Sequence, residues 1–356
     1  MKKLSYLFIG LFALFTVACE QDNTDLKETE LQAQIQLPKD APAFVVELYD
    51  YLLEQGADQA VEVRNENQSV YEYLTFKPEL SSFKAAVDRI PGLRLILSNG
   101  LLPVTVFVPT NEAFATFLAE NGLASLDDVP QALLNQVISN HILLGAIDVE
   151  WLKMYQKTLA YADCDVRGRL NIYSEMIDPR NAIINGDVNI VRGNLFVGRS
   201  FVHVVDKVIE PSTVVDFATS DPRFSTLVEA LTCPNLGIDF LGALTTEGNV
   251  FTIFAPTNDA FDKLAAELGV SSVCDIPAET LTQVLAYHVK LGASVASIRL
   301  SSGVELTTLL EGETLVSEVD GTDLNIVGNN STGTVVIPNV QANNGVIHAI
   351  DMVLLP

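Results

Sequence analysis

Two ten-residue stretches of the chain are nearly the same, and this duplication limits the fold more than any other feature. The first is TVFVPTNEAF, residues 105–114, and the second is TIFAPTNDAF, residues 252–261. Alternating side chains at the start of each stretch indicate a strand with two distinct faces. The proline then removes a backbone donor and ends the strand, and the threonine after it suits the N-cap of a helix. The corner residues are Pro109, Thr110 and Asn111 in the first copy and Pro256, Thr257 and Asn258 in the second.

Further landmarks recur in register with these corners. His141, in NQVISNHILLG, and His288, in TQVLAYHVKLG, are 147 residues apart, and so are the two corner prolines. FVHVVDKVIEP and VIHAIDMVLLP end 145 residues apart, at Pro211 and Pro356. A period of this length is too long for a solenoid repeat and suits a whole domain.

These motifs resemble the fasciclin domain, and the resemblance covers roughly residues 68–356. It implies an α+β fold of two tandem fasciclin domains, each a β-wedge or sandwich with packed helices. We expect domain one to span residues 68–211 and domain two to span residues 212–356. The linker is little more than Pro211–Thr213, and a joint this short restricts the angle between the domains.

The N-terminus has the pattern of a targeting signal rather than of a folded element. Lys2 and Lys3 precede an apolar run, residues 4–18, that is too short to span a bilayer comfortably. The sequence TVAC at residues 16–19 resembles a bacterial lipobox, with Thr16 where leucine is usual. The resemblance implies a signal peptide over residues 1–18 and lipidation of Cys19, which would hold the protein to a membrane. An ordinary secretory signal with a nearby free cysteine is the alternative.

Residues 19–40 are polar and acidic, and we interpret them as a tether. Acids just after a lipidated cysteine resemble the surface-export signal of Bacteroidetes lipoproteins, although solvated tails are often acidic as well. This resemblance implies an outer-membrane lipoprotein, with the cell surface and the periplasmic side both open as locations.

Residues 41–67 are expected to form a helical extension. The apolar positions from Phe44 to Leu53 fit one face of a helix. We expect this helix to dock on domain one, with a partner-binding helix as the alternative.

The formal net charge of −24 is unusual for a chain of 356 residues. Such a surface repels polyanions, so we expect no nucleic-acid partner. The hydrophobic content of 48% is enough for two cores of ordinary size.

The four histidines form two matched pairs, with His141 and His203 in the first repeat and His288 and His348 in the second. A metal site needs several ligands that meet. His203 is three residues before Asp206 in a predicted strand, and side chains three apart on a strand face opposite sides. We therefore interpret the histidines as structural and expect no metal and no cofactor.

Tyr287 and His288 match a tyrosine–histidine pair that the fasciclin resemblance links to adhesion. Domain one has Asn140 before His141, so the pair is incomplete there. Helical spacing places His288 on an apolar stripe, which favours core packing over ligand contact. Ligand binding by Tyr287 and His288 remains the alternative.

Cysteine usage allows one disulfide in domain two. Cys233 and Cys274 are 41 residues apart, and an exported protein meets oxidising conditions. Closing that loop contributes about 4 kcal/mol of stability in the chain-entropy model. The alternative is that these two cysteines and Cys164 are buried free thiols.

Residues 155–180 have no clear match in the second repeat, whose residues 300–327 are expected to keep more regular strands. Trp151, Tyr155 and Tyr161 are candidates for an exposed aromatic platform that would bind a glycan. Asn343, Asn344 and Gly345 predict a hairpin turn in which Gly345 has a positive φ.

No catalytic motif stands out in the chain. GxSxG, HExxH, CxxC, Walker and GxGxxG patterns are absent, and no catalytic residue is expected. Residues 185–187 and 320–323 are polar but are spaced as hairpin turns rather than as a calcium loop. The first hypothesis is a non-enzymatic, membrane-anchored adhesion or interaction lipoprotein that binds a protein or a glycan. The second is a glycan-binding accessory of an outer-membrane nutrient-uptake complex, and a hydrolase is a distant third.

Overall fold

The duplicated motif folds twice into the same strand, corner and helix. The computed structural model describes residues 68–163, 165–234 and 236–356, with the backbone alone for residues 165–167. The signal peptide over residues 1–18, Cys19, the tether over residues 19–40, the extension over residues 41–67 and Cys164 lie outside the described residues.

Domain one begins with short helices and ends with a meander of strands. Ser69 caps the first helix in a capping box with Glu72, and the proline at position 78 starts the turn that follows. The elements are α3 Val70–Thr75, η1 Pro78–Leu80, α4 Ser81–Asp88, α5 Pro91–Ser98, β1 Val104–Pro109, α6 Asn111–Glu120, η2 Leu126–Asp128, α7 Gln131–Asn140, β2 Ile142–Leu144, η3 Val149–Trp151, β3 Tyr155–Ala162, β4 Asp165–Asp178, β5 Asn181–Ile184, β6 Val188–Val197 and β7 Ser200–Val205.

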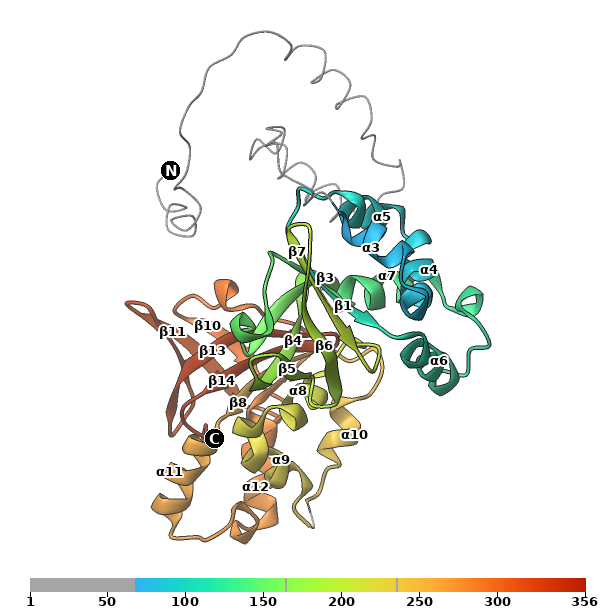
Figure 1. Ribbon diagram of the computed structural model, residues 1–356. Helices are drawn as coiled ribbons and strands as arrows, with labels where there is room; N and C mark the ends of the chain where they lie inside the picture. The colour runs from blue at the N-terminus through green and yellow to red at the C-terminus, as the bar shows by residue number, and fades with distance from the viewer. Residues whose placement is uncertain (1–67, 164, 235) are drawn as a thin grey trace, which may run out of the picture. The chain divides into compact units, whose positions relative to one another are not determined.

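The seven strands of domain one close on themselves. β1 pairs with β2 in antiparallel and with β7 in parallel, and the remaining neighbours pair in chain order. The closing contact joins β2 to β3 at Leu143 and Thr158. The helices α3–α7 gather at one end of these strands (Figure 1).

Domain two repeats this order. Its elements are α8 Val214–Ser220, η4 Pro222–Phe224, α9 Ser225–Thr232, α10 Phe240–Leu244, β8 Phe251–Pro256, α11 Asn258–Leu268, η5 Val273–Asp275, α12 Ala278–Tyr287, β9 Val289–Leu291, η6 Ser297–Arg299, β10 Val304–Thr307, β11 Thr314–Asp320, β12 Asp323–Val327, β13 Thr332–Ala342 and β14 Gly345–Ile350.

The sheet of domain two has seven strands in the order β10-β11-β12-β13-β14-β8-β9. The parallel pair β8 and β14 matches β1 and β7, with Phe254 beside His348 as Phe107 lies beside His203. Unlike the sheet of domain one, this sheet stays open between β9 and β10. Each domain is therefore a mixed α+β unit with a seven-stranded sheet and packed helices, which confirms the two α+β domains that the fasciclin resemblance implies.

The structure corrects the two-faced strand that the alternation indicates. All six residues of β1 are buried, and so are all six of β8 and of β14. These strands lie at the centre of each domain, so apolar side chains cover both of their faces. Thr105 and Thr252 are also fully buried, and they donate their hydroxyls to the carbonyls of Gly145 and Ala293.

The divergent segment of domain one has longer strands than its counterpart in domain two, but they pair less regularly. Its strands β3 and β4 have 8 and 14 residues, whereas β10 and β11 of domain two have 4 and 7. The β3–β4 and β4–β5 pairings contain register shifts, whereas β10, β11, β12 and β13 pair in order without one. Domain two therefore keeps the more regular strands, as expected.

The hairpin after β13 forms where expected, but Gly345 has another role. Its φ is not positive, and it pairs with Phe251 as the first residue of β14. A Cβ on Gly345 would lie 2.4 Å from the carbonyl oxygen of Phe251, so close backbone approach explains the glycine. In domain one the matching hairpin uses Gly198, with φ of 60°, and Ser200 starts the strand.

Candidate functional site

The asparagine of each Pro-Thr-Asn corner holds a short turn and the helix that follows it, η1 and α4 in domain one and η4 and α9 in domain two. The Asn111 side-chain amide donates to the Pro78 carbonyl at 2.8 Å and accepts the Ser82 N–H at 2.9 Å. Asn258 repeats both contacts, with the Pro222 carbonyl at 2.9 Å and the Thr226 N–H at 3.0 Å. Because the two asparagines lie 29 to 36 residues from their partners, sequence spacing alone does not show this role.

The threonines of the corners both stand at N-cap positions. Thr110 accepts the Ala113 N–H at 3.2 Å. Thr257 holds the same place before α11 but makes no side-chain capping hydrogen bond. Pro109 and Pro256 end β1 and β8. These six residues therefore build the corner between sheet and helix.

His141 and His288 are buried and held by backbone groups on both nitrogens. In each ring Nδ1 lies 2.7 Å from the carbonyl four residues earlier, that of Val137 or Val284. Nε2 accepts a backbone N–H, from Ile209 at 2.9 Å or from Leu354 at 2.8 Å. Burial lowers the pKa of both imidazoles to about 4, so both are neutral at pH 7.

His203 and His348 use the opposite tautomer. Nε2 donates to the carbonyl of Ile147 at 3.0 Å or of Val295 at 2.9 Å, and Nδ1 accepts the N–H of Asn194 or Asn339. Burial lowers the pKa of both rings, to about 4 for His348. The neighbouring acids do not share these partners: Asp206 accepts from Asn189. Within the described ranges, no three His, Cys, Asp or Glu side chains gather as a metal site would require.

Tyr287 lies in the core rather than on the surface. Its side chain is fully buried, and its hydroxyl donates to the Thr314 carbonyl at 2.9 Å and accepts the Asn329 N–H at 3.1 Å. Burial raises the pKa of its hydroxyl. With His288 only 3% exposed beside it, the pair supports the packing of α12 against β11 and the C-terminal segment.

Cys233 and Cys274 are joined by a disulfide, with Cα atoms 5.5 Å apart. Cys233 follows α9, and Cys274 is the middle residue of η5. At the same two places in domain one, Arg89 follows α4 and Asp127 is the middle residue of η2, and their side chains form an ion pair. The two domains therefore tie the same helix to the same turn, one with a covalent bond and the other with opposite charges.

Tyr155 does not belong to an exposed aromatic platform, because it lies against domain two. Its hydroxyl donates to Asp221 at 2.8 Å, and its ring packs on Tyr173 and Phe217. Asp221 is 1% exposed and also pairs with Arg223, whose guanidinium lies over the Tyr155 ring. Burial raises the pKa of Tyr155, and that of Tyr173 to about 12.

The hairpin tip between β13 and β14 is a second contact between the domains. The Asn343 side-chain oxygen accepts from Gln136 at 2.7 Å and from the Asp163 N–H at 3.0 Å, and its amide donates to Asp163. Asn171 of β4 accepts the Gln341 N–H at 2.9 Å. The turn residues that sequence spacing predicts are therefore also part of the domain joint.

A hollow of about 570 Å³ lies at this joint. Its lining includes three acids, Asp187, Glu210 and Asp216. Asp187 forms an ion pair with Lys207, and Asp216 accepts the Thr213 N–H. Burial, with the nearby charge of Glu120, raises the pKa of Glu210. Its walls come from residues 185–188, from the segment around the linker and from α8.

Trp151 is the one predicted ligand residue that faces solvent. It ends η3 and is 74% exposed, next to a carboxylate cap from Asp148. Met154 and Phe196 of the same domain are also exposed.

Among the described residues, no helix reaches the length and apolar content that crossing a bilayer requires.

Comparisons with known proteins agree with this architecture. Protein sll1483 of Synechocystis sp. is 38% identical over 144 residues, which are 40% of this chain and 73% of that protein. The cell surface glycolipoprotein MPB83 of Mycobacterium bovis is 34% identical over 149 residues, 40% of this chain and 60% of that protein. A solved domain pair from the insect cell adhesion molecule fasciclin I shares the fold, with a TM-score of 0.50 and 20% identity over 78% of this chain and 97% of that chain.

The model of the fasciclin domain matches residues 78–211 and again residues 222–356. The two matches cover most of the sequence and coincide with the two repeated units of the structure. The chain therefore belongs to the fasciclin domain family, as two domains in tandem.

Proposed function

We propose that this chain is an extracytoplasmic adhesion or interaction lipoprotein whose fasciclin domains bind a protein or glycan ligand. The carrying observation is the tandem fasciclin pair, because fasciclin domains often occur in adhesion and cell-surface proteins that are typically non-enzymatic. The histidines add to this: in both domains their nitrogens are occupied by backbone groups, so none is free to act on a substrate.

Anchoring through Cys19 to the outer membrane is part of the proposal. The lipobox-like sequence before Cys19 supports it, as does similarity to a cell surface glycolipoprotein. The Cys233–Cys274 disulfide suits an oxidising compartment. The tether of residues 19–40 would place the domains away from the bilayer, and the net charge of −24 disfavours nucleic acid as a partner.

Protease shaving of intact cells with mass-spectrometric readout tests this location. We expect peptides from both domains to be released from intact cells carrying the unaltered protein. The Cys19→Ala variant should lose its membrane association while its domains stay folded. Peptides that appear only after lysis would place the protein on the periplasmic side instead.

A glycan-binding accessory of a nutrient-uptake complex is the second candidate, and exposed Trp151 is the observation that favours it. Aromatic faces stack on sugar rings, and the Trp151 side chain is 74% exposed and therefore accessible to a glycan. Binding on a glycan panel should disappear in Trp151→Ala and persist in Ile298→Ala, which removes an exposed apolar side chain from η6 of domain two. No binding to any glycan would leave the protein ligand as the proposal.

A further inference from the structure

The disulfide of domain two stands at the start of a connection that differs between the domains. In domain one, α5 begins two residues after Arg89 and has eight residues. In domain two, α10 begins seven residues after Cys233 and has five. The chain itself therefore places α5 tightly, whereas α10 is a shorter helix on a longer connection.

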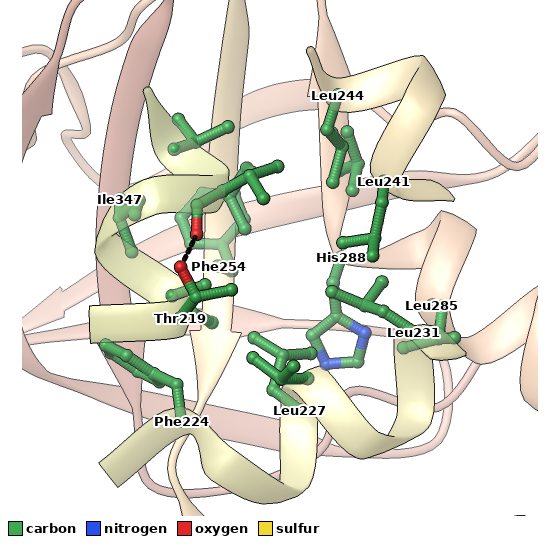
Figure 2. Close-up of a pocket in the computed structure, with 17 residues that line it drawn as sticks. Thr219, Phe224, Leu227, Leu231, Leu241, Leu244, Phe254, Leu285, His288 and Ile347 are labelled. Carbon is green, nitrogen blue, oxygen red and sulfur yellow. Dashed lines mark hydrogen bonds between the residues drawn. The ribbon is translucent and has the colours of Figure 1, made fainter. Parts of the chain in front are cut away.

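This shorter helix forms one wall of an apolar cavity. The cavity has a volume of about 30 Å³ and lies between the sheet and the helices α8, α9, α10 and α12. Leu241 and Leu244 face it from α10, opposite Thr219 and Ile347 (Figure 2). Apolar side chains make up nearly all of its lining, so a water there would find too few polar partners to bridge α10 to the opposite wall.

Few polar contacts hold α10 in place. Asp239 caps its own helix through the Gly242 N–H at 3.0 Å, and the Leu244 carbonyl accepts from Asn344 at 2.8 Å. Phe240 and Leu244 are buried. Beyond the disulfide, α9 is joined to η5 by a hydrogen bond from Ser272 to Glu229 at 2.9 Å, which is solvent-exposed.

We infer that the Cys233–Cys274 disulfide keeps this cavity closed and that its reduction lets α10 open away from the sheet. The disulfide fixes the point from which the connection to α10 departs. Without it, the connection gains conformational freedom, which is opposed by the apolar contacts of a five-residue helix and by the hydrogen bond from Asn344 to the Leu244 carbonyl. Domain one has the Arg89–Asp127 ion pair in place of the disulfide, and a shorter connection leads to its helix α5.

The redox step is a thiol–disulfide exchange with an external dithiol. Cys274 is exposed and Cys233 is 8% exposed, so a reductant thiolate reaches Sγ of Cys274. A mixed disulfide forms there, and the Sγ of Cys233 leaves as a thiolate and takes up a proton. The second thiol of the reductant then displaces Cys274 Sγ, which is also protonated, and the reductant becomes a cyclic disulfide. The protein gains two electrons and two protons, and the dithiol loses them.

Hydrogen exchange of the full-length protein tests the opening directly. The Cys233→Ser/Cys274→Ser variant stands for the reduced state without exposing other cysteines to reductant. We expect backbone amides of α10 to exchange about tenfold faster or more in the variant and in the dithiol-treated protein. Amides of β8 and β14, and of α5 in domain one, should change less than about twofold.

Two results would overturn the inference. Unchanged exchange in α10 would mean that the disulfide does not hold it, and equal loss of protection in β8 and β14 would mean that the bond supports the whole domain. The neutral dye Nile red gives a second readout: its fluorescence should rise on reduction and should not rise in Ala218→Leu, which fills the cavity from α8. A rise of the same size in the filled variant would show that another surface takes the dye.

Discussion

At the residue scale, the four histidines show how the fold decides a protonation state. Each ring donates from one nitrogen to a carbonyl and accepts a backbone N–H on the other. A protonated ring cannot accept, so charging any of these rings breaks one hydrogen bond and places a charge in the core. Every buried side-chain nitrogen and oxygen of the described residues has such a partner.

Acid should therefore destabilise both domains. In the unfolded chain the histidines take up protons near pH 6.5, whereas in the folded state the pKa of His141, His288 and His348 is about 4. The unfolded state binds more protons between these values, so the free energy of unfolding should fall as pH drops from 6.5 to 4. Urea unfolding between pH 6.5 and pH 4 measures this pH dependence.

In His288→Phe we expect the free energy of unfolding to fall by about 1–3 kcal/mol, because the Leu354 N–H loses its acceptor. That variant should also show a shallower pH slope, and an unchanged slope would contradict the assignment.

Gly345 tests a second residue-scale feature, the close approach of two strands. Gly345→Ala should destabilise domain two by about 1–3 kcal/mol, because its Cβ would meet the Phe251 carbonyl oxygen at 2.4 Å. Gly237→Ala is the matched control, because Gly237 also lacks a positive φ and nothing lies within 4 Å of the new methyl. Thermal unfolding should show a clear loss for Gly345→Ala and little loss for Gly237→Ala, and equal losses would contradict the crowding at Gly345.

At the element scale, the Pro-Thr-Asn corner joins three elements with one side chain. Asn111 reaches back to η1 and α4, and Asn258 reaches back to η4 and α9. Asn258→Ala should lower the stability of domain two by about 1–3 kcal/mol, because it leaves the Thr226 N–H unpaired. Calorimetry of Asn258→Ala and Thr257→Ala compares the stability lost in the two variants. Thr257 makes no capping hydrogen bond, so Thr257→Ala should lose less stability. A larger loss in Thr257→Ala would contradict the role of the Asn258 hydrogen bonds.

The disulfide that joins α9 to η5 in domain two can be introduced at the matching positions of domain one. Arg89→Cys/Asp127→Cys places two cysteines where Cys233 and Cys274 lie in domain two. A disulfide should form and stabilise domain one by up to about 4 kcal/mol in the chain-entropy model. Mass spectrometry would detect the bond, and unfolding with and without reductant would measure the gain. If the two new cysteines fail to form a disulfide, positions 89 and 127 differ in geometry from positions 233 and 274 despite their matched places in the fold.

At the scale of the whole molecule, the described residues of both domains share contacts across the joint. Tyr173 of domain one belongs to the apolar cluster of domain two, with Tyr155 packed against it. Tyr155→Ala should separate the unfolding of the domains into two calorimetric transitions, because Asp221 loses its hydrogen bond from domain one and Phe217 loses its aromatic contact there. Trp151→Ala, a change at an exposed residue nearby, should leave the unfolding profile unaltered. A single transition in Tyr155→Ala would mean that Asn343 and Gln341 suffice to couple the domains.

Much of the fold could be predicted from the sequence because its signals are local. The corner prolines, the caps at Thr110 and Thr257 and the hairpins at residues 185–187 and 320–323 depend on neighbouring residues, and the structure has each at its expected place. The matched spacing of His141 and His288 likewise marked equivalent positions in two domains. These features follow from the conformational preferences of neighbouring residues and from the sequence repeat, and both can be read from the sequence.

Only the tertiary structure decided which surfaces are covered. Alternation predicted two faces for β1, yet both are buried, because helices and strands from distant parts of the chain cover them. Tyr155 and Trp151 are four residues apart and equally suited to bind a glycan by type, but domain two covers one and leaves the other exposed. Gly345 serves close packing instead of a turn for the same reason. Local conformation is set by bonds between neighbours, whereas burial depends on partners that the sequence order does not bring together.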